Sequence, residues 1–366
     1  MDITTIRRRT TTPSARTNRS RIRRGVVALI ATGAALAGAG VPGAHATSTD
    51  RLEVKYAFDD PRPTSAATEL PEGIAVDRRG NLYASLGPPF FVGGGYGAVV
   101  RIAPDGSRRT LVELPDGPAP AGIVVDRSFR VAFAVPDPGG PDVGVYRVRR
   151  GGGAERIAGT DAMAVPNGLA LGPRGALFVT DSALGQIWRI PRRARVGHGG
   201  EEADSWLSHP LLAGCAPGQV GANGIAVHRG DLFVANSERG LLLRVPVLSD
   251  GSPGDPIIVA GDPDCESTDE LYSLDGIAIH RRGDVFAALV LQNRLVRIDQ
   301  RTGTATQLLD GDDGLWNPAS VAFGSARHER DLLFIANYAV LAPEPPASLG
   351  PALLLYRPSG AGRSHR

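Results

Sequence analysis

One short motif recurs six times along this chain of 366 residues. Each copy has a polar or small first residue, then glycine (serine in the last copy), and then a short apolar run. The copies begin 49, 46, 56, 52 and 44 residues apart. In order, they are Glu72–Asp77, Ala121–Asp126, Asn167–Gly172, Asn223–His228, Asp275–His280 and Ala319–Gly324. A period of this length predicts a repeat architecture in which each unit packs on its neighbours.

Each copy is followed by further short apolar runs that are separated by turn residues. The second run carries an aromatic residue, which is Tyr83, Phe133, Phe178, Phe233, Phe286 or Phe334. In most copies a third, alternating run such as Gly185–Ile190 and a weaker fourth such as Pro256–Ala260 complete the unit. Four short β-runs without a helical period are typical of one propeller blade. The sequence therefore predicts an all-β fold, a six-bladed β-propeller of four-stranded blades.

Two further apolar runs flank the repeats, and they predict how the ring closes. Leu52–Phe58 precedes the first copy, and Leu353–Tyr356 follows the sixth. We expect the N-terminal strand to complete the last blade beside the C-terminal strand, so that the propeller spans residues 47–358. Residues 359–366 are predicted to form a disordered tail.

The first 46 residues have the pattern of a signal peptide. An arginine-rich segment ends at Arg23-Arg24, an apolar run covers Gly25–Gly40, and Ala44-His45-Ala46 fits a cleavage site. The apolar run is shorter than the ~20 residues that cross a bilayer. We expect cleavage after Ala46, export by the twin-arginine or the general secretory route, and a secreted protein without a membrane span.

The charge of the chain differs between this leader and the rest. Residues 1–46 contain eight arginines and one acidic residue, so the other 320 residues hold 32 basic and 37 acidic residues. Nothing in the repeats suggests a nucleic-acid surface, which would need clustered cations to neutralise phosphates. We expect a monomer that acts on a small-molecule substrate.

The first residues of the six copies form a candidate metal site. Because the first strand of each blade lines the central channel, these residues should meet at one channel mouth. Four of them carry side-chain oxygens, namely Glu72, Asn167, Asn223 and Asp275, whereas Ala121 and Ala319 hold the other two places. Such oxygen donors suit Ca²⁺ best, with Mg²⁺, Mn²⁺ or Zn²⁺ as alternatives. Any one of the four could instead cap a turn, but four at equivalent positions favour the metal.

With these residues in view, the chain resembles the senescence-marker protein/gluconolactonase/luciferin-regenerating-enzyme family. The similarity covers nearly the whole chain after the leader, and its most specific part is Asn223-Gly224 followed by Asp275-Gly276 in the next blade. Paraoxonase-type lactonases use a similar ring. The resemblance implies a six-bladed propeller with a divalent cation held by Glu72, Asn223 and Asp275, while Asn167 contacts the metal's water or the substrate.

The resemblance also implies an activity, namely metal-dependent hydrolysis of a lactone or related ester. We expect catalytic roles for Asp275, which would orient or deprotonate a water molecule, and for Asn167 on the substrate side. Two alternatives stay open. Glu72-Gly73-Ile74 is equally similar to the NHL repeat of non-enzymatic propellers, which would make the protein a secreted binding or scaffold module. A biosynthetic cyclase could also use this fold.

Other polar residues are interpreted as structural. His228 and His280 fall at the turn after the first strand, and we expect both to be turn residues. Asp181, Asn236 and Asn337 end second strands and are predicted to bond their own loops. Substrate specificity would come from the loops over residues 86–97, 136–144 and 339–350.

The chain has two cysteines, Cys215 and Cys265, and they lie eight residues before Asn223 and ten before Asp275. They therefore occupy near-equivalent loops that lead into successive blades. Since an exported protein meets an oxidising compartment, we predict a disulfide between them that holds the two loops together.

Overall fold

The computed structural model describes residues 52–58, 69–89, 95–115, 117–194, 201–265, 270–340 and 348–358. The predicted signal peptide over residues 1–46 and the predicted tail over residues 359–366 lie outside the described residues.

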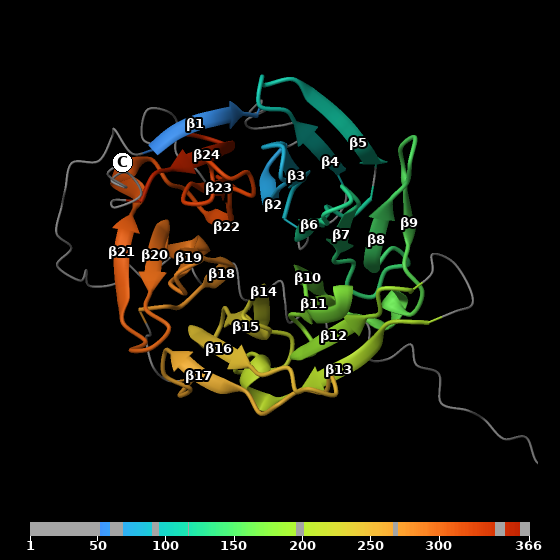
Figure 1. The fold of residues 1–366 in the computed structure, drawn as a ribbon, viewed down its shortest axis with the longest axis vertical. Coiled ribbons are helices and arrows are strands. Elements are labelled where there is room, and N and C mark those ends of the chain that lie inside the picture. Colours follow the sequence, from blue (N-terminus) through green and yellow to red (C-terminus); the bar gives the residue numbers. More distant parts are fainter. Residues whose placement is uncertain are drawn as a thin grey trace, which may run out of the picture.

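Six antiparallel four-stranded sheets are arranged as blades around a central axis, which confirms the predicted β-propeller (Figure 1). The innermost strands are β2 (Pro71–Val76), β6 (Ile123–Val125), β10 (Pro166–Leu171), β14 (Ala222–His228), β18 (Leu274–Ile279) and β22 (Pro318–Phe323). The second strands are β3 (Leu82–Leu86), β7 (Val131–Val135), β11 (Leu177–Asp181), β15 (Asp231–Asn236), β19 (Val285–Leu289) and β23 (Leu333–Asn337). We number the blades 1 to 6 in the order of these strands.

The outer halves of the blades follow the same order. The third strands are β4 (Tyr96–Ile102), β8 (Gly144–Val148), β12 (Gln186–Ile190), β16 (Leu241–Val245), β20 (Arg294–Ile298) and β24 (Ala352–Tyr356). The outermost strands are β5 (Arg108–Pro115), β9 (Ala154–Arg156), β13 (Asp204–Ser208), β17 (Ile257–Ala260), β21 (Ala305–Leu309) and β1 (Leu52–Ala57). Short 3-10 helices occur in the connections, at Thr160–Ala162, Pro173–Gly175, Pro210–Leu212, Val290–Gln292 and Gly311–Asp313. No helix of the described chain is long and apolar enough to cross a membrane.

The ring closes through blade 6, where the N-terminal strand is the outer neighbour of the last strand (Figure 1). Strand β1 pairs antiparallel with β24, with Leu52 opposite Tyr356 and Ala57 opposite Ala352. The predicted closure is therefore confirmed. Because the first and last strands share one sheet, the blade cannot form until both ends of the repeat array have folded.

The apolar core lies between the blades. Each of the six main clusters of buried side chains combines residues from two neighbouring blades. For example, Tyr83 and Val99 of blade 1 pack against Ile123 and Phe133 of blade 2. The aromatic residue that recurs in the second run is buried in every blade. A blade thus has an apolar face that only its neighbour covers, which explains why the unit repeats around a closed ring.

Candidate active site

A β-bulge at the start of the innermost strands sets the direction of the ring side chains. In blade 1, Pro71 pairs with Leu86 and Gly73 with Ser85, so that Glu72 has no partner of its own. Strands β10, β14, β18 and β22 show a register shift at the corresponding place. A bulge re-aims a side chain out of the regular alternation of a strand. The first residue of the motif can therefore face the channel while the rest of the strand packs between blades.

The glycine after the ring residue allows neighbouring innermost strands to approach closely. A Cβ atom on Gly224 would lie 2.2 Å from the carbonyl oxygen of Asp275, and one on Gly168 would lie 2.5 Å from that of Asn223. Gly73, Gly122 and Gly276 are equally close to the ring residue of the next blade. Any larger residue would push the strands apart. The recurring glycine is therefore what makes the ring narrow enough for side chains from different blades to meet.

Hydroxyl groups from the second strands join neighbouring blades at this level. Ser85 donates to the carbonyl oxygen of Ala121, and Thr180 donates to that of Asn223. Ser237 donates to the Leu274 carbonyl oxygen at 2.6 Å and accepts from the Asn223 amide at 2.9 Å. These hydroxyls fix the ring strands against each other. The sequence interpretation missed them, although a serine or threonine near the end of the second strand recurs in three blades.

The four predicted ring residues do come together. Glu72, Asn167, Asn223 and Asp275 line one cavity of about 80 Å³ on the axis of the propeller, together with Ala319. The two asparagines are buried, with exposed fractions of 7% and 6%. The two carboxylic acids are enclosed by the surrounding strands but remain partly accessible from the channel. The ring is therefore a small, oxygen-rich site, in which the remaining first residue, Ala121, contributes no donor.

The electrostatics of the ring are those of two acids without a cationic partner. Burial raises the pKa of Asp275 to about 8, although a hydrogen bond from Asn223 acts in the opposite direction. Burial and the nearby Asp275 carboxylate raise the pKa of Glu72 well above its ordinary value. No lysine or arginine lines the cavity. Two such acids ionise together only if a positive charge joins them.

The donor set fits a hard divalent cation. Two carboxylates and two carboxamides supply oxygens of the kind that Ca²⁺ binds, and no cationic side chain lines the cavity. Among the described residues, no group of three His, Cys, Asp or Glu side chains could hold a metal ion. A cation in this ring would therefore depend on amide oxygens as well as on Glu72 and Asp275.

Tyr338 belongs to the site and was missed at the level of sequence. Its side chain is buried, and burial together with the charges of Glu72 and Asp275 raises its pKa well above the ordinary value. It therefore keeps its proton and presents an O–H donor near the two acids. Tyr338 directly follows the second strand of blade 6, where Ser182 and Ser237 follow those of blades 3 and 4. That equivalence was the signal that could have identified it.

The predicted disulfide is confirmed. Cys215 and Cys265 are bonded, with their Cα atoms 5.7 Å apart. Arg239 supports the same two loops, because it donates to the carbonyl oxygen of Ala213 at 3.0 Å and to that of Pro263 at 2.9 Å. The covalent bond and the arginine thus tie together the loops that lead into β14 and β18, the strands of Asn223 and Asp275.

The residues that end the second strands have structural roles, as predicted, and they bond the loop before the first strand of their blade as well as their own loop. Asp181 accepts from the backbone of Ala164 at 2.8 Å and of Val165 at 3.1 Å. The Asn236 amide donates to two carbonyl oxygens of the preceding loop, both at 2.9 Å. Asn337 accepts from the Trp316 backbone at 2.8 Å. These side chains shape the channel-side loops and do not line the ring.

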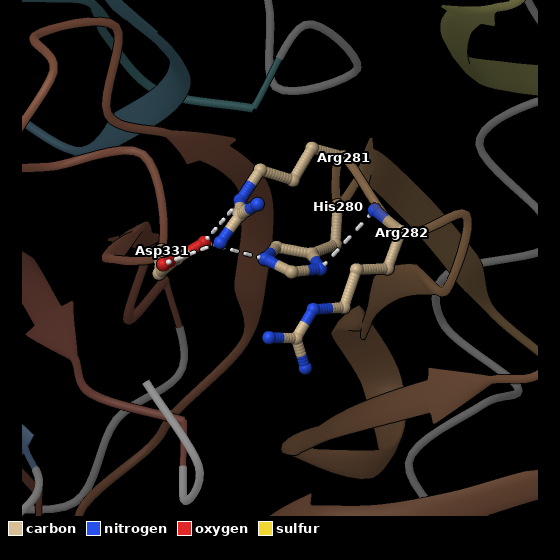
Figure 2. A network of polar contacts seen from close by, with 4 residues as sticks. All are labelled: His280, Arg281, Arg282 and Asp331. Atoms are coloured by element: carbon tan, nitrogen blue, oxygen red, sulfur yellow. Dashed lines mark hydrogen bonds and ion pairs between the residues drawn. The ribbon is translucent and has the colours of Figure 1, made fainter. Parts of the chain in front are cut away.

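The two histidines lie at the opposite end of their strands from the ring, at the turn after the first strand. His280 contacts Asp331 of blade 6 at 2.8 Å, and Arg281 contacts the same carboxylate at 2.9 Å (Figure 2). Burial lowers the pKa of His228, whose ring packs edge-on against Phe233. Both histidines are turn residues, as expected. The structure does not bring them to the acids.

Other predictions for the site remain untested or fall outside the described residues. Of the loops expected to set specificity, residues 90–94 and 341–347 are not described. Two wider clefts, of about 770 and 470 Å³, open at the turn end of the blades. They are larger than the ring cavity, but neither contains a ring residue.

The comparison with known proteins places this geometry in context. No family model matches the chain. The chain is 33% identical over 130 residues to Protein cueball of Drosophila ananassae, a match that covers 34% of this chain and 19% of that protein. It therefore spans about one fifth of the length of the curated relative that it matches.

The solved structures cover much more of the chain. A gluconolactonase from Xanthomonas campestris aligns with a TM-score of 0.57 and 19% identity, over 88% of this chain and 98% of that one. A luciferin-regenerating enzyme gives a TM-score of 0.54 and 14% identity, over 81% and 94%. A streptogramin B lyase gives 0.51 and 12%, over 85% and 99%. The chain has the fold of the gluconolactonase-type propellers. The fold predicted from the resemblance is thus confirmed, whereas sequence identities this low leave the chemistry to the site itself.

Proposed function

We propose that the protein is a secreted, divalent-metal-dependent hydrolase that opens a lactone or related ester at the channel mouth. The observation that carries the proposal is the convergence of Glu72, Asn167, Asn223 and Asp275 on one cavity of about 80 Å³. The raised pKa values of both acids support it, because they mark a place where the fold has gathered negative charge without neutralising it. The gluconolactonase and the luciferin-regenerating enzyme share this fold.

Glu72, Asn223 and Asp275 would hold the cation, and Ca²⁺ suits their oxygens best. When bound, the cation would polarise the ester carbonyl and lower the pKa of a water molecule. Asn223 is oriented for this role because its amide nitrogen donates to Ser237, which leaves its oxygen free to act as a ligand. Asn167, one blade earlier, would donate its amide N–H to the substrate carbonyl.

The remaining groups would move the proton. Asp275 would orient the attacking water and accept its proton as the oxygen adds to the carbonyl carbon. The bond from that carbon to the ring oxygen then breaks, and the proton passes to the departing alkoxide, so that the product is a hydroxy acid. Tyr338 keeps its own proton and would donate a hydrogen bond from its hydroxyl group near Glu72 and Asp275.

Metal analysis of the purified protein, combined with a panel of lactones and aryl esters, tests this proposal. We expect about one divalent cation per chain, loss of turnover on chelation, and recovery when Ca²⁺ is added. Asp275→Asn and Asn223→Ala should each lower turnover more than about 100-fold while the circular dichroism spectrum stays unchanged. Absence of a stoichiometric metal together with chelator-resistant activity would contradict the site assignment.

The scaffold alternative rests on a separate observation. The segment Glu72-Gly73-Ile74 resembles the sequence of an NHL repeat. The residue after the glycine is Ile74, and the strand forms its bulge at Glu72. A protein of this kind would bind the metal as a structural element. Stoichiometric Ca²⁺ without turnover across the whole substrate panel would favour it over the hydrolase.

A further inference from the structure

A cleft between blades 2 and 3 has a strongly positive lining. It encloses about 470 Å³ and lies at the turn end of the blades, about 20 Å along the strands from the ring. Four arginines line it, Arg127, Arg130, Arg147 and Arg192, against one carboxylate, Asp126. We propose that this cleft binds a small oxyanion with two or more negative charges, carried by phosphate or carboxylate groups. The proposal is independent of the chemistry at the ring.

Blade 2 departs from the repeat at one position that lines this cleft. Tyr83, Phe178, Phe233 and Phe286 stand opposite an arginine of the third strand in blades 1, 3, 4 and 5. In blade 2 the residue opposite Arg147 is Ala132. Both residues line the cleft, and both face blade 3. Arg147 therefore faces the cleft without an aromatic ring opposite it, whereas Arg189 in the adjoining cleft has Phe178 opposite it.

Arg147 also lacks the carboxylate that its counterparts in blades 3 and 4 have. Arg189 of blade 3 pairs with Asp204 at 3.0 Å, and Arg244 of blade 4 lies 3.9 Å from Asp231. Within the described chain, Arg147 has no ion pair, and its pKa is lowered by burial and by the charge of Arg130. Arg130 itself is paired with Asp126 at 2.7 Å. A half-buried guanidinium without an anion is costly, and a bound ligand would supply the anion.

At the turn end, the contact between blades 5 and 6 contains a carboxylate that the contact between blades 2 and 3 lacks. Arg281, which follows the turn residue His280, contacts Asp331 of the next blade (Figure 2). Arg127 follows the turn residue Asp126 in the same way. The position that Asp331 holds, two residues before the second strand, is occupied in blade 3 by Gly175, which lines the cleft. The carboxylate that closes one contact is therefore absent from the other.

The chemistry of the lining defines the ligand class. Guanidinium groups bind phosphate and carboxylate through paired N–H donors, and three arginines without a described carboxylate partner favour a multiply charged anion. The cleft volume is that of a metabolite-sized site. The adjoining cleft between blades 3 and 4 differs, because Glu201, Glu202 and Asp204 offset its arginines.

Calorimetric titration of the purified chain with glycerol 2-phosphate and with tricarballylate tests the proposal. We expect one equivalent of at least one of the two probes to bind, and binding to weaken as sodium chloride is raised. Arg147→Gln should weaken binding about tenfold, because it removes one charge-assisted pair. Ala132→Phe, which places an aromatic ring opposite Arg147 as in blades 1, 3, 4 and 5, should weaken binding by taking up space beside the guanidinium group. The preferred probe shows whether phosphate or carboxylate is recognised.

Two matched variants locate the site. Arg244→Gln changes the same repeat position in blade 4 and should bind as the unaltered protein does. Asp275→Asn should also bind normally, which separates this cleft from any anion held at the ring. Absence of heat with both probes, equal binding by Arg147→Gln and the unaltered protein, or loss of binding in Asp275→Asn would each overturn the proposal. Should Ala132→Phe fail to fold, Arg147→Gln alone decides.

Discussion

The two ends of the innermost strands carry acidic residues in opposite surroundings. At the channel end, burial raises the pKa of Asp275 to about 8, and burial with the neighbouring carboxylate raises that of Glu72. At the turn end, hydrogen bonds from Arg281 and His280 hold the pKa of Asp331 far below its ordinary value. At the contact between blades 5 and 6, the acid of the turn end is thus paired within the protein, whereas no lysine or arginine lines the ring that holds the other two acids.

This difference predicts that the two ends respond to pH in opposite directions when no divalent cation is bound. The lowered pKa of Asp331 stabilises the folded chain above pH ~4 and not below it. Asp275 has a higher pKa in the folded chain than in the unfolded chain, where an aspartic acid titrates near 4. The contribution of Asp275 to stability is therefore fully present below pH ~4 and is lost as pH rises towards ~8, because only the unfolded chain gains the charge. We expect the chelated protein to lose roughly 5 °C in Tm over this range. Ca²⁺ should remove the slope.

Thermal scans of the chelated and the Ca²⁺-loaded protein measure this effect, and chelated Asp275→Asn is the matched control. The substitution removes one of the two titrating acids, so that the slope should become shallower while Glu72, whose pKa burial also raises, causes the rest. An unchanged slope in Asp275→Asn would show that other groups cause the pH dependence and would remove the contrast between the two ends.

The disulfide adds to the comparison of the two ends, because it connects loops at the channel end and none at the turn end. Cys215 and Cys265 close a loop with a sequence separation of 50 residues. Replacing both by serine should lower the free energy of unfolding by roughly 4 kcal/mol through the greater entropy of the unfolded chain. Arg239→Gln, which removes the two arginine bonds but keeps the disulfide, is the control and should cost less. Urea unfolding measures both, and free alkylation of the two cysteines without reduction would contradict the bond.

Much of the fold could be predicted from the sequence because the propeller is a repeat. The six copies fixed the number of blades, the aromatic positions marked the packed faces, and the flanking runs Leu52–Phe58 and Leu353–Tyr356 predicted ring closure. The ring residues could be predicted for the same reason, since equivalent positions in a closed ring face one axis. Cys215 and Cys265 were paired by the same argument.

The rest depends on features that a repeat pattern does not show. Tyr338 lies near the acids, just after the end of a second strand, at a position equivalent to Ser182 and Ser237, but its distance from the ring depends on how the strands are arranged in the fold. The cleft between blades 2 and 3 contains Ala132, which stands opposite an arginine where blades 1, 3, 4 and 5 have an aromatic residue. The bulges and the hydroxyl groups between blades depend on hydrogen bonds between strands that lie far apart in the sequence. Departures from the repeat therefore deserve as much scrutiny as the repeat itself.

Gly224 lies near the ring end of β14, and Gly230 lies in the turn after it. Replacing each by alanine tests whether close spacing of the strands is needed at the ring. Gly224 lies close to the next blade, because a Cβ atom on it would be 2.2 Å from the Asp275 carbonyl oxygen. A Cβ atom on Gly230, at the turn, would have no atom within 4 Å. Gly224→Ala should destabilise the protein by about 3 kcal/mol, because the ring must widen. Gly230→Ala should cost about 1 kcal/mol, which reflects only its φ of 98°.

Denaturant unfolding of both variants gives the two costs, and Ca²⁺ titration separates their effects on the ring. Gly224→Ala should also weaken Ca²⁺ binding, while Gly230→Ala should leave it unchanged. Equal costs for the two alanines, with Ca²⁺ affinity retained in both, would mean that strand spacing at the ring is not what the glycine provides.

The smallest effect is expected at the turn end, where the contact between His280 and Asp331 is partly exposed. The two side chains are 13% and 31% accessible, and Arg281 already neutralises the carboxylate. His280→Ala should therefore cost less than about 1 kcal/mol, as partly exposed pairs do. Turnover and Ca²⁺ binding should not change, because the residue lies at the far end of its strand from Asp275. A double-mutant cycle with Asp331→Asn isolates the coupling between the two side chains. Loss of turnover in His280→Ala at full metal occupancy would instead show that this histidine takes part in catalysis. The distinction between a structural turn end and a functional channel end would then be wrong.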